Sequence, residues 1–246
     1  MTTLKNWLLD IFFPRHCLGC NVLLRENKLS YLCQHCQAAI KFKNDFACAF
    51  CRSPVKNGKT CQFCIKDHFL DRLLVSTSYE NPLAEKSLKM MKYRFIAMLA
   101  GDIAGFMVKY MQNSLIKKLG IETGTVVVPV PLHRERLNWR GFNQSELIAV
   151  KIADNFEWPL VTNELKRVRA NKPQIEMPDR NSRIKNMKNI FQYAPARVGS
   201  PDIKGKTILL IDDISTTGST LDDCARALKG AGAKKVIGFV FARNKI

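Results

Sequence analysis

The sequence predicts an α/β domain built on a parallel sheet and preceded by a small cysteine-rich module. Short continuous apolar runs at TVVVPV (125–130), TILLID (207–212) and VIGFVFA (236–242) are typical of strands buried on both faces. Segments with helical periodicity separate these runs, and strands that alternate with helices indicate a parallel sheet. Because almost all cysteines precede residue 65, we divide the chain into domains at 1–70 and 71–246.

The apolar stretch NWLLDIFFP (6–14) predicts a short amphipathic helix. Its residues Trp7, Leu8, Ile11 and Phe12 are expected to pack on the neighbouring module, with membrane contact as the alternative. The stretch is too short for a transmembrane helix and lacks the cleavage site of a secretory signal. Since no other run reaches the ~18 apolar residues of a membrane span, we expect a cytoplasmic protein without a stable membrane span.

Eight of the nine cysteines form CxxC pairs, a spacing that lets one tight turn present two sulfurs to the same metal ion. Disulfides are disfavoured in the cytoplasm, so the repeated spacing indicates metal binding. The pairs are Cys17/Cys20, Cys33/Cys36, Cys48/Cys51 and Cys61/Cys64. Consecutive pairing predicts a double zinc ribbon with two structural zinc ions. The alternative arrangement shares one ion between the first and third pairs, and the alternative metal centre is an iron–sulfur cluster.

The other potential metal ligands are expected to play no direct part in these sites. His16, His35 and His68 border the cysteines, but each site already has four sulfurs. These histidines are therefore expected to be exposed or to lie beside the ligands. Cys224 falls in a predicted helix and is expected to be a small buried residue.

The second module begins with a predicted strand at RLLVSTSY (72–79). Residues 83–119 then predict a helix, because apolar residues recur at helical spacing and form a core-facing stripe. The stripe comprises Leu88, Met91, Phe95, Leu99, Ile103, Met107 and Met111. Two further helices are predicted at 144–155 and 219–230, the second of which ends at the glycines of KGAGAKK.

Adjacent carboxylates end the predicted strand at 207–212 and precede a loop rich in hydroxyls. In parallel sheets, ligands bind beyond the carboxyl ends of the strands, where Asp212 and Asp213 are expected to lie. The loop opens a helix, so its backbone N–H groups form a seat for an anion. The loop residues are Ser215, Thr216, Thr217, Gly218, Ser219 and Thr220. This combination predicts a sugar phosphate site, and the alternative is a strand end followed by an ordinary helix cap.

The stretch ILLIDDISTTGSTL (208–221) resembles the phosphoribosyl pyrophosphate motif of type I phosphoribosyltransferases. Together with the double zinc ribbon, four further features make nearly the whole chain similar to the ComF family of competence proteins: VPVPLHRERLNWRGFNQSELIA (128–149), Gln174, the Arg183 and Asn186 pair, and Phe191. The resemblance implies a parallel sheet of the type I phosphoribosyltransferase kind. It also implies a role in natural transformation, in which incoming single-stranded DNA is handled next to a helicase-like translocase.

The resemblance also implies roles for individual residues. Asp212 and Asp213 would hold the ribose hydroxyls, and the segment from Thr216 to Thr220 would wrap the 5′-phosphate. The pyrophosphate loop and the mobile loop over the site would comprise Pro131, Leu132, His133, Arg134, Arg140, Gly141, Asn143 and Gln144. Pro129 and Pro131 leave fewer backbone donors there than an ordinary phosphoribosyltransferase has, which weakens the case for nucleobase transfer.

The formal net charge of +18 predicts a polyanionic partner, with a solubility role as the alternative. Basic residues gather at 166–188 and at 134–140, and Trp139 and Phe142 interleave with the second group, as expected of a surface that binds single strands through phosphate contacts and base stacking. The predicted nucleic-acid residues are Arg136, Trp139, Arg140, Phe142, Lys166, Arg167, Arg169 and Arg183. A solvated polar face is the alternative interpretation of the same residues.

Two functions of different classes follow. The first is a DNA-uptake protein that handles single-stranded DNA, has the translocase as its protein partner, and carries a pocket for phosphoribosyl pyrophosphate or a related sugar phosphate. The second is a Mg²⁺-dependent phosphoribosyltransferase with an unknown acceptor, in which Asp212 and Asp213 would be catalytic and would stabilise positive charge on the sugar ring.

Overall fold

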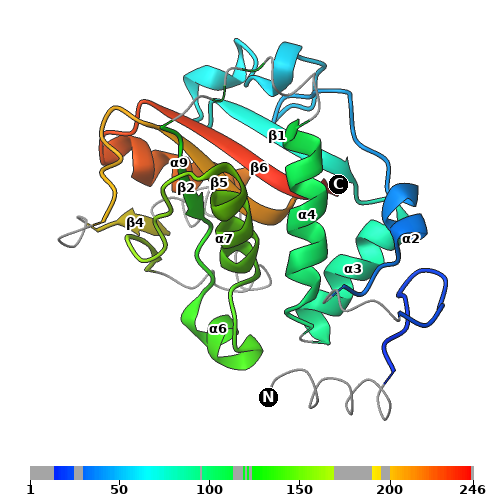
Figure 1. Cartoon of the computed structure of the whole chain (residues 1–246). Helices are drawn as coiled ribbons and strands as arrows, with labels where there is room; N and C mark the ends of the chain where they lie inside the picture. The colour runs from blue at the N-terminus through cyan, green and yellow to red at the C-terminus, as the bar shows by residue number, and fades with distance from the viewer. Residues whose placement is uncertain are drawn as a thin grey trace, which may run out of the picture.

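The computed structural model of the chain describes residues 14–24, 30–94, 96–112, 119, 121, 124–168, 190–194 and 200–244. At its centre is a four-stranded sheet in the order β1-β6-β5-β2, in which neighbouring strands are parallel (Figure 1). The strands are β1 (Arg72–Ser78), β2 (Val126–Pro129), β5 (Thr207–Ser215) and β6 (Lys235–Arg243). The predicted parallel sheet is therefore confirmed.

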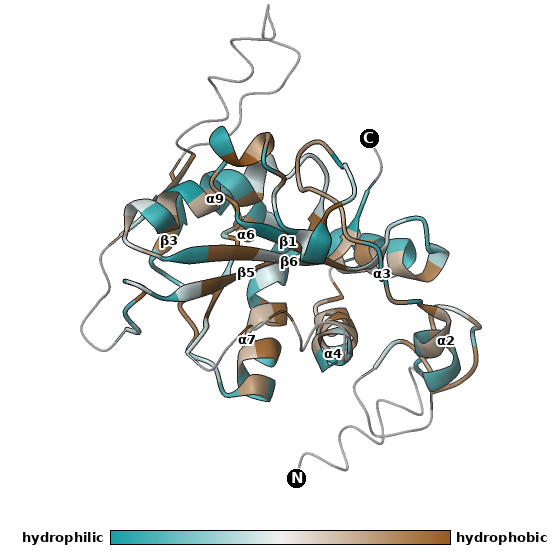
Figure 2. Cartoon of the chain, turned by 90° about the horizontal axis from the view of Figure 1, so that it is seen from above, coloured by the Kyte–Doolittle hydropathy of each residue, from teal (hydrophilic) through white to brown (hydrophobic). Residues whose placement is uncertain are grey.

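Helices cover both faces of this sheet, with α9 on one side and α4 and α7 on the other (Figure 2). The bounds are α3 (Pro82–Tyr93), α4 (Leu99–Gln112), α7 (Gln144–Phe156) and α9 (Ser219–Gly230). The first three pack on one apolar core, whereas α9 packs on the second core together with the short antiparallel pair β3 (Leu165–Arg167) and β4 (Phe191–Tyr193). The chain is thus a three-layer α/β structure.

Strand β5 explains why the strands are apolar without interruption. Leu209 and Ile211 face the core under α4 and α7, while Ile208 and Leu210 face the core under α9. All four side chains are fully buried. Successive side chains of a strand point to opposite faces, so a strand covered on both sides needs apolar residues at every position.

The segment predicted as one helix at 83–119 forms two helices, so this prediction was wrong in its continuity. α3 ends at Tyr93, and α4 begins at Leu99. The apolar stripe is nevertheless buried on both helices, as seen at Leu88, Met91 and Ile103, while Phe95 lies outside the described residues. The connection RFIAM (94–98) contains no proline or glycine that would have signalled the break.

Two other features were not anticipated. A short helix α6 (Arg134–Arg140) follows β2 and ends at Gly141, whose φ of +79° is left-handed. Strand β5 continues three residues beyond its predicted end, because its pairing with β6 extends to Ser215 and Arg243. The two adjacent aspartates therefore lie inside the strand.

The cysteine module contacts both helical layers. The first ribbon (residues 16–40, including α2, Gln34–Ala39) packs on α3 and α4: the Nζ of Lys86 donates to the carbonyl of Leu18 at 2.6 Å, and Asp102 accepts from Ser30 Oγ at 2.6 Å. The second ribbon (residues 47–68) includes short 3₁₀ turns at Lys56–Gly58 and Cys64–Lys66 and lies on the α9 side. The amphipathic helix predicted at 6–14 falls, except for Pro14, outside the described residues.

Candidate functional site

The topology of the sheet switches at β2 and β5, and the region beyond the carboxyl ends of these two strands is called the crevice below. These strands are neighbours, but α7, which follows β2, and α9, which follows β5, lie on opposite faces. Pairing with β2 ends at Ile211, and beyond this point β5 continues in register with β6 to Ser215. Ligands of open α/β sheets bind at such a switch point, beyond the carboxyl ends of the strands.

Asp212 and Asp213 lie on β5 directly after its pairing with β2 ends, close to the carboxyl end of the strand. Asp212 Oδ1 accepts a hydrogen bond from Ser145 Oγ at 2.8 Å and another from the backbone N–H of Asp213 at 2.9 Å. Burial, and next the charge of Asp213, raise the pKa of Asp212 to about 7, although the bond from Ser145 opposes this shift. A bound cation would relieve the repulsion between the two adjacent carboxylates.

Asp213 is the more buried of the two, with 2% of the residue exposed. Its Oδ2 lies 2.9 Å from the Nζ of Lys92 on α3. The contact is an ion pair without hydrogen-bond geometry, so Oδ2 has no hydrogen-bond donor among the described residues. The ammonium group of Lys92 thus offsets one of the two adjacent negative charges.

The segment between α6 and α7 brings further polar groups to the crevice. Arg140 is 8% exposed, and its Nη1 donates to Gln144 Oε1 at 2.6 Å. Burial lowers the pKa of Arg140, whereas the nearby charge of Asp213 raises it. Asn143 caps α7 through Ser145 N and donates to the carbonyl of Val130 at 3.1 Å. The Nε of Arg140 has no acceptor among the described residues, so a buried donor is available beside the aspartates.

The other residues predicted for the pyrophosphate loop line the turn from β2 into α6. Pro131, Leu132 and His133 are half-buried, and Arg134 is exposed. His133 precedes α6 as its N-cap residue, and its Nδ1 lies 3.5 Å from Glu135 Oε2. These positions are compatible with contact to a ligand at the crevice, and their assigned role stays a prediction.

The loop from Ser215 to Thr220, called the 215–220 loop below, connects β5 to α9. Gly218 is the N-cap of α9 with φ +85°, and no side chain forms a cap hydrogen bond on it. Thr217 Oγ1 and Ser219 Oγ lie 2.9 Å apart, while Thr217 Oγ1 is 3.4 Å from the N–H of Ser219. The helix start is therefore only weakly capped, as expected of a seat whose N–H groups serve an anion.

The predicted nucleic-acid residues are divided between α6 and β3. On α6, Arg136 is exposed and Trp139 is 60% exposed, while Phe142, just after the helix, is half-buried against the α4 and α7 core. On β3, Lys166 is exposed, and the guanidinium of Arg167 lies 5.7 Å from the centre of the Phe191 ring. Arg169 and Arg183 lie outside the described residues, as do Gln174 and Asn186.

Electrostatics link these two elements to the crevice. Burial lowers the pKa of Arg167, and the charge of Arg136 lowers it further. The charge of Arg136 also lowers the pKa of Arg140. Positive side chains from α6, β3 and the crevice are therefore close enough to repel one another.

Two residues of the site, Ser145 and Lys92, were not predicted from the sequence. Ser145 directly follows the segment RGFNQ, so its place at the start of a helix beside a strand end was a usable signal. Lys92 lies more than a hundred residues before Asp213, and a lysine in a helix is ordinarily expected to point to solvent. Only the packing of α3 against the sheet identifies it.

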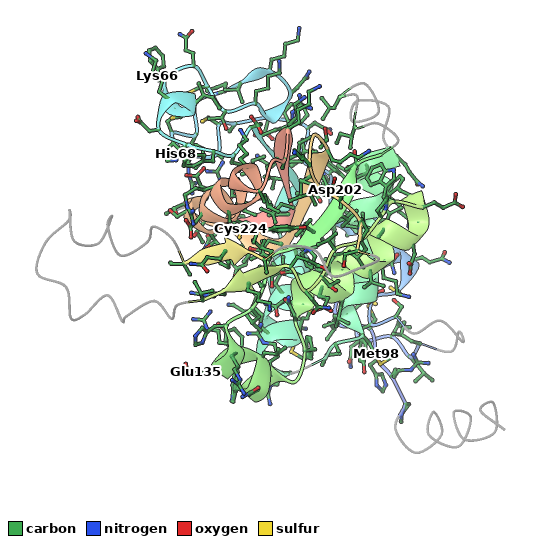
Figure 3. All side chains as sticks on the ribbon, turned by 90° about the vertical axis from the view of Figure 1, so that its left-hand side faces the viewer. Lys66, His68, Met98, Glu135, Asp202 and Cys224 are labelled. Carbon is green, nitrogen blue, oxygen red and sulfur yellow. The ribbon has the colours of Figure 1, made fainter. Side chains whose placement is uncertain are left out.

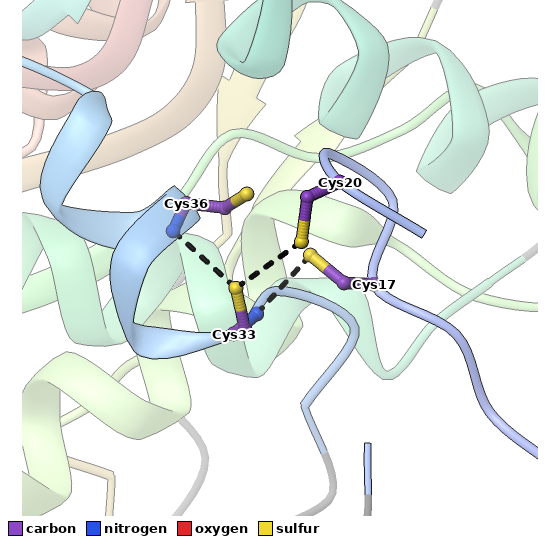
Figure 4. A group of neighbouring side chains, drawn as sticks. All are labelled: Cys17, Cys20, Cys33 and Cys36. Atoms are coloured by element: carbon purple, nitrogen blue, oxygen red, sulfur yellow. Dashed lines mark hydrogen bonds between the residues drawn. The ribbon is translucent and has the colours of Figure 1, made fainter. Parts of the chain in front are cut away.

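The eight paired cysteines form two groups, each with all its sulfurs within 4.8 Å of one another. Cys17, Cys20, Cys33 and Cys36 form the first (Figure 4), and Cys48, Cys51, Cys61 and Cys64 form the second. This confirms consecutive pairing. The Cys20–Cys33 and Cys51–Cys61 sulfurs are each 3.6 Å apart, close to the ~3.8 Å between sulfurs that surround one zinc ion at ~2.3 Å. The spacing suits a single tetrahedral ion, because the sulfurs around an iron–sulfur cluster stand further apart.

The acidities within each group also fit a metal site. Hydrogen bonds from Ser53 lower the pKa of Cys51 to about 6. Burial and the neighbouring thiols raise the pKa of Cys64 to about 12, and Cys36 in the first group is raised in the same way to about 12. Four adjacent sulfurs do not all ionise by themselves, so a bound cation is needed to hold four thiolates together. The residues therefore fit structural zinc.

The remaining cysteine and the bordering histidines behave as expected. Cys224 is fully buried in α9, and burial raises its pKa well above the ordinary value. His68 stacks on Phe50 with ring centres 3.5 Å apart, and its Nδ1 is 2.8 Å from Asp222 Oδ2. His68 therefore joins the second ribbon to α9 and is not among the grouped metal ligands.

Among the described residues, no helix combines the length and the apolar character needed to cross a membrane.

Comparison with known proteins agrees with both modules. Residues 143–246 match the model of the phosphoribosyl transferase domain, and residues 8–65 match the model of the double zinc ribbon domain. Competence protein F of Haemophilus influenzae is 27% identical over 229 residues, which cover 92% of this chain and 95% of that protein. Competence protein ComFC of Bacillus subtilis is 28% identical over 220 residues, with 87% and 84% coverage.

A third relative is the DNA utilization protein YhgH of Salmonella typhimurium, which is 27% identical over 206 residues, or 83% of this chain and 87% of that protein. Such similarities extend over both modules, and the order of the modules is the order of the two domain models. The motif segments, the paired cysteine groups and the parallel sheet agree with them. These comparisons support the resemblance of both modules to the ComF family of competence proteins.

Proposed function

We propose that the chain is a competence protein that handles incoming single-stranded DNA and carries a phosphoribosyl-type pocket beside its DNA surface. The names of its relatives support the competence role. The net charge of +18 supports a polyanionic partner. As the family resemblance implies, the expected protein partner is a helicase-like translocase.

The observation that carries the proposal is that Arg136, exposed on α6, is near both Arg140 and Arg167 of β3. Its charge acts against the charge of each of these two guanidinium groups. Like charges that are held together raise the local positive potential, which favours binding of a phosphate backbone. Trp139, 60% exposed on the same helix as Arg136, supplies an aromatic surface on which a base can stack.

The pocket itself favours a phosphoribosyl group, such as phosphoribosyl pyrophosphate, as ligand. The carboxyl groups of Asp212 and Asp213 suit ribose hydroxyls, since carboxylates accept hydrogen bonds from hydroxyls, as Asp212 Oδ1 already does from Ser145. The weakly capped start of α9 suits the 5′-phosphate. Mg²⁺ is the cation expected to accompany a pyrophosphate group.

A second candidate is a Mg²⁺-dependent phosphoribosyltransferase whose acceptor is unknown. The observation that favours it is the pair of adjacent carboxyl groups near Arg140, a buried guanidinium whose Nε has no acceptor among the described residues. In this reaction Asp212 and Asp213 would stabilise the positive charge that develops on the sugar ring. Arg140 and the turn from Pro131 to Arg134 would contact the leaving pyrophosphate.

The experiment is fluorescence anisotropy of a labelled single-stranded oligonucleotide, titrated with the protein at several salt concentrations. Binding should weaken as salt rises, and the charge reversals Arg136→Glu and Arg167→Glu should each lower affinity and reduce the salt slope by ~1. Lys235→Glu is the matched control, because Lys235 is exposed at the opposite, amino edge of the sheet. Equal effects of all three reversals would overturn the placement of the DNA surface.

The same titration with phosphoribosyl pyrophosphate and Mg²⁺ tests the pocket. Displacement of DNA by the sugar phosphate would mean that both ligands share the crevice. Undisturbed binding of both would mean separate sites. Absence of DNA binding near physiological salt would overturn the DNA-handling proposal, and release of pyrophosphate with an acceptor would then favour the enzyme.

A further inference from the structure

The second ribbon lies directly against the 215–220 loop, far from α6. In Figure 3, Lys66 and His68 of the second ribbon and Glu135 of α6 are at opposite ends of the molecule, with Cys224 of α9 between them. An added Cβ at Gly218 would lie 3.2 Å from the carbonyl oxygen of Ala49 and 3.4 Å from the Phe50 ring. The tight turn from Cys48 to Cys51, called the second knuckle below, therefore packs directly against the loop.

Arg52 fastens this knuckle to the loop. It directly follows Cys51, and its Nη2 donates to the carbonyl of Thr216 at 3.2 Å and to the carbonyl of Asn244 at 3.0 Å. One guanidinium thus joins the second cysteine group, the 215–220 loop and the end of β6. Guanidinium hydrogen bonds are stronger than neutral ones, so this contact restrains the loop.

Arg243 fastens the knuckle from the other side. Its Nη1 and Nη2 donate to the carbonyls of Cys48 and Ala49 at 3.1 and 2.5 Å. Arg52 and Arg243 thus hold the same turn from two sides, and each does so through two hydrogen bonds to backbone carbonyls.

The backbone of Arg52 points to the same conclusion. Its φ is +64°, a left-handed conformation that is uncommon for arginine. The corresponding position of the first ribbon, after Cys20, is Asn21 with φ +61°. Asparagine tolerates this conformation well, and arginine does so less well. The second knuckle therefore carries a less suitable residue for the turn, and that residue is the one that reaches the loop.

We infer that Arg52 is a positioning residue, which makes the conformation of the 215–220 loop depend on the metal state of the second cysteine group and not on that of the first. Metal binding and folding of such turns are coupled. Loss of the metal ion from the second cysteine group would therefore move Arg52, Ala49 and Phe50 away from the loop together. As regards the ligand, the inference rests on the proposed function, because the loop is the proposed phosphate seat.

The test is hydrogen–deuterium exchange of the 215–220 loop in the full-length zinc-bound protein. Arg52→Asn removes the guanidinium but keeps a residue that tolerates the left-handed turn, and it should speed exchange in the loop ~10-fold with the zinc content unchanged. Lys86→Met is the matched control, since it removes the hydrogen bond to Leu18 that fastens the first ribbon. It should leave exchange in the loop as in the wild type.

Cysteine variants test the dependence on metal. Cys51→Ser should lose one zinc ion and speed exchange in the loop at least as much as Arg52→Asn does, whereas Cys20→Ser should lose one zinc ion without this effect. Both cysteines are exposed, so the comparison is matched. Unchanged exchange in Arg52→Asn, or equal effects of the two cysteine variants, would overturn the inference.

Ligand binding separates this inference from the proposed function. Affinity for phosphoribosyl pyrophosphate with Mg²⁺ should fall ~10-fold in Arg52→Asn, while salt-dependent binding of DNA through α6 is retained. If the wild type binds no phosphoribosyl pyrophosphate but exchange responds as described, the proposed ligand is wrong and the role of Arg52 stands.

Discussion

The ammonium group of Lys92 lies 2.9 Å from the carboxylate of Asp213, and this ion pair joins α3 to the centre of the sheet. The side chain of Asp213 is 3% exposed and that of Lys92 is 20% exposed. A carboxylate buried to this degree is stable only with a nearby countercharge or a ligand. The helix that follows β1 therefore supports the crevice formed by β2 and β5.

Replacing Lys92 with methionine should destabilise the protein by ~3–5 kcal/mol, because it leaves a buried charge without its partner. Urea denaturation measures the loss. The double variant Lys92→Met with Asp213→Asn should recover most of it, since the uncompensated charge is then gone. A single variant as stable as the wild type would mean that the ion pair does not form in solution.

Asp212→Asn should stabilise the protein in a pH-dependent manner. The pKa of Asp212 in the folded state is raised to about 7, so the folded protein holds a proton that the unfolded chain has already released. Stability therefore falls as pH rises from the ordinary carboxyl pKa of ~4 to about 7. The advantage of Asp212→Asn should grow across this window and level off above it.

Thermal unfolding of both proteins between about pH 4 and pH 8 measures this advantage. The asparagine Oδ1 still accepts the hydrogen bonds from Ser145 and from the Asp213 backbone, so the contacts are matched. A constant difference in Tm across the whole range would contradict the raised pKa. Mg²⁺ should reduce the difference if it binds the carboxylate pair.

Gly218→Ala should destabilise the protein by more than Gly205→Ala does. Both glycines have a left-handed φ, +85° and +71°, so alanine costs ~1–2 kcal/mol at each. Only Gly218 also lies against another element, the Ala49 carbonyl and Phe50 ring of the second ribbon, whereas a Cβ at Gly205 would meet nothing within 4 Å. Denaturant titration of the two variants compares their losses in the free energy of unfolding. Equal losses would show that the second ribbon moves away from the new Cβ at no cost in stability.

The purified protein should contain two zinc ions per chain, one in each cysteine group. Elemental analysis of the wild type, Cys20→Ser and Cys51→Ser checks this count, and each variant should lose one ion. Removal of both ions by a strong chelator should lower Tm, because metal binding stabilises the folded ribbons. Iron in place of zinc, or loss of both ions in either variant, would contradict the assignment.

Strand positions were predictable because the sheet is covered on both faces. That arrangement requires uninterrupted apolar runs, and these stand out from the polar turns around them. The cysteine groups were predictable for a similar reason, since CxxC spacing itself presents two sulfurs to one ion. The break between α3 and α4 was not predictable, because the RFIAM connection has no helix-breaking residue and the corner results from packing on the sheet.

By itself, the sequence determined the order of the strands along the chain, the two metal-binding groups and the strand on which Asp212 and Asp213 lie, because each depends on residues close together in the chain. Only the tertiary structure decided which distant groups meet there. Lys92 reaches Asp213 from α3, and Arg52 reaches Thr216 from the second ribbon. Such contacts depend on how helices and ribbons pack on a twisted sheet, and no local pattern of residues encodes that packing.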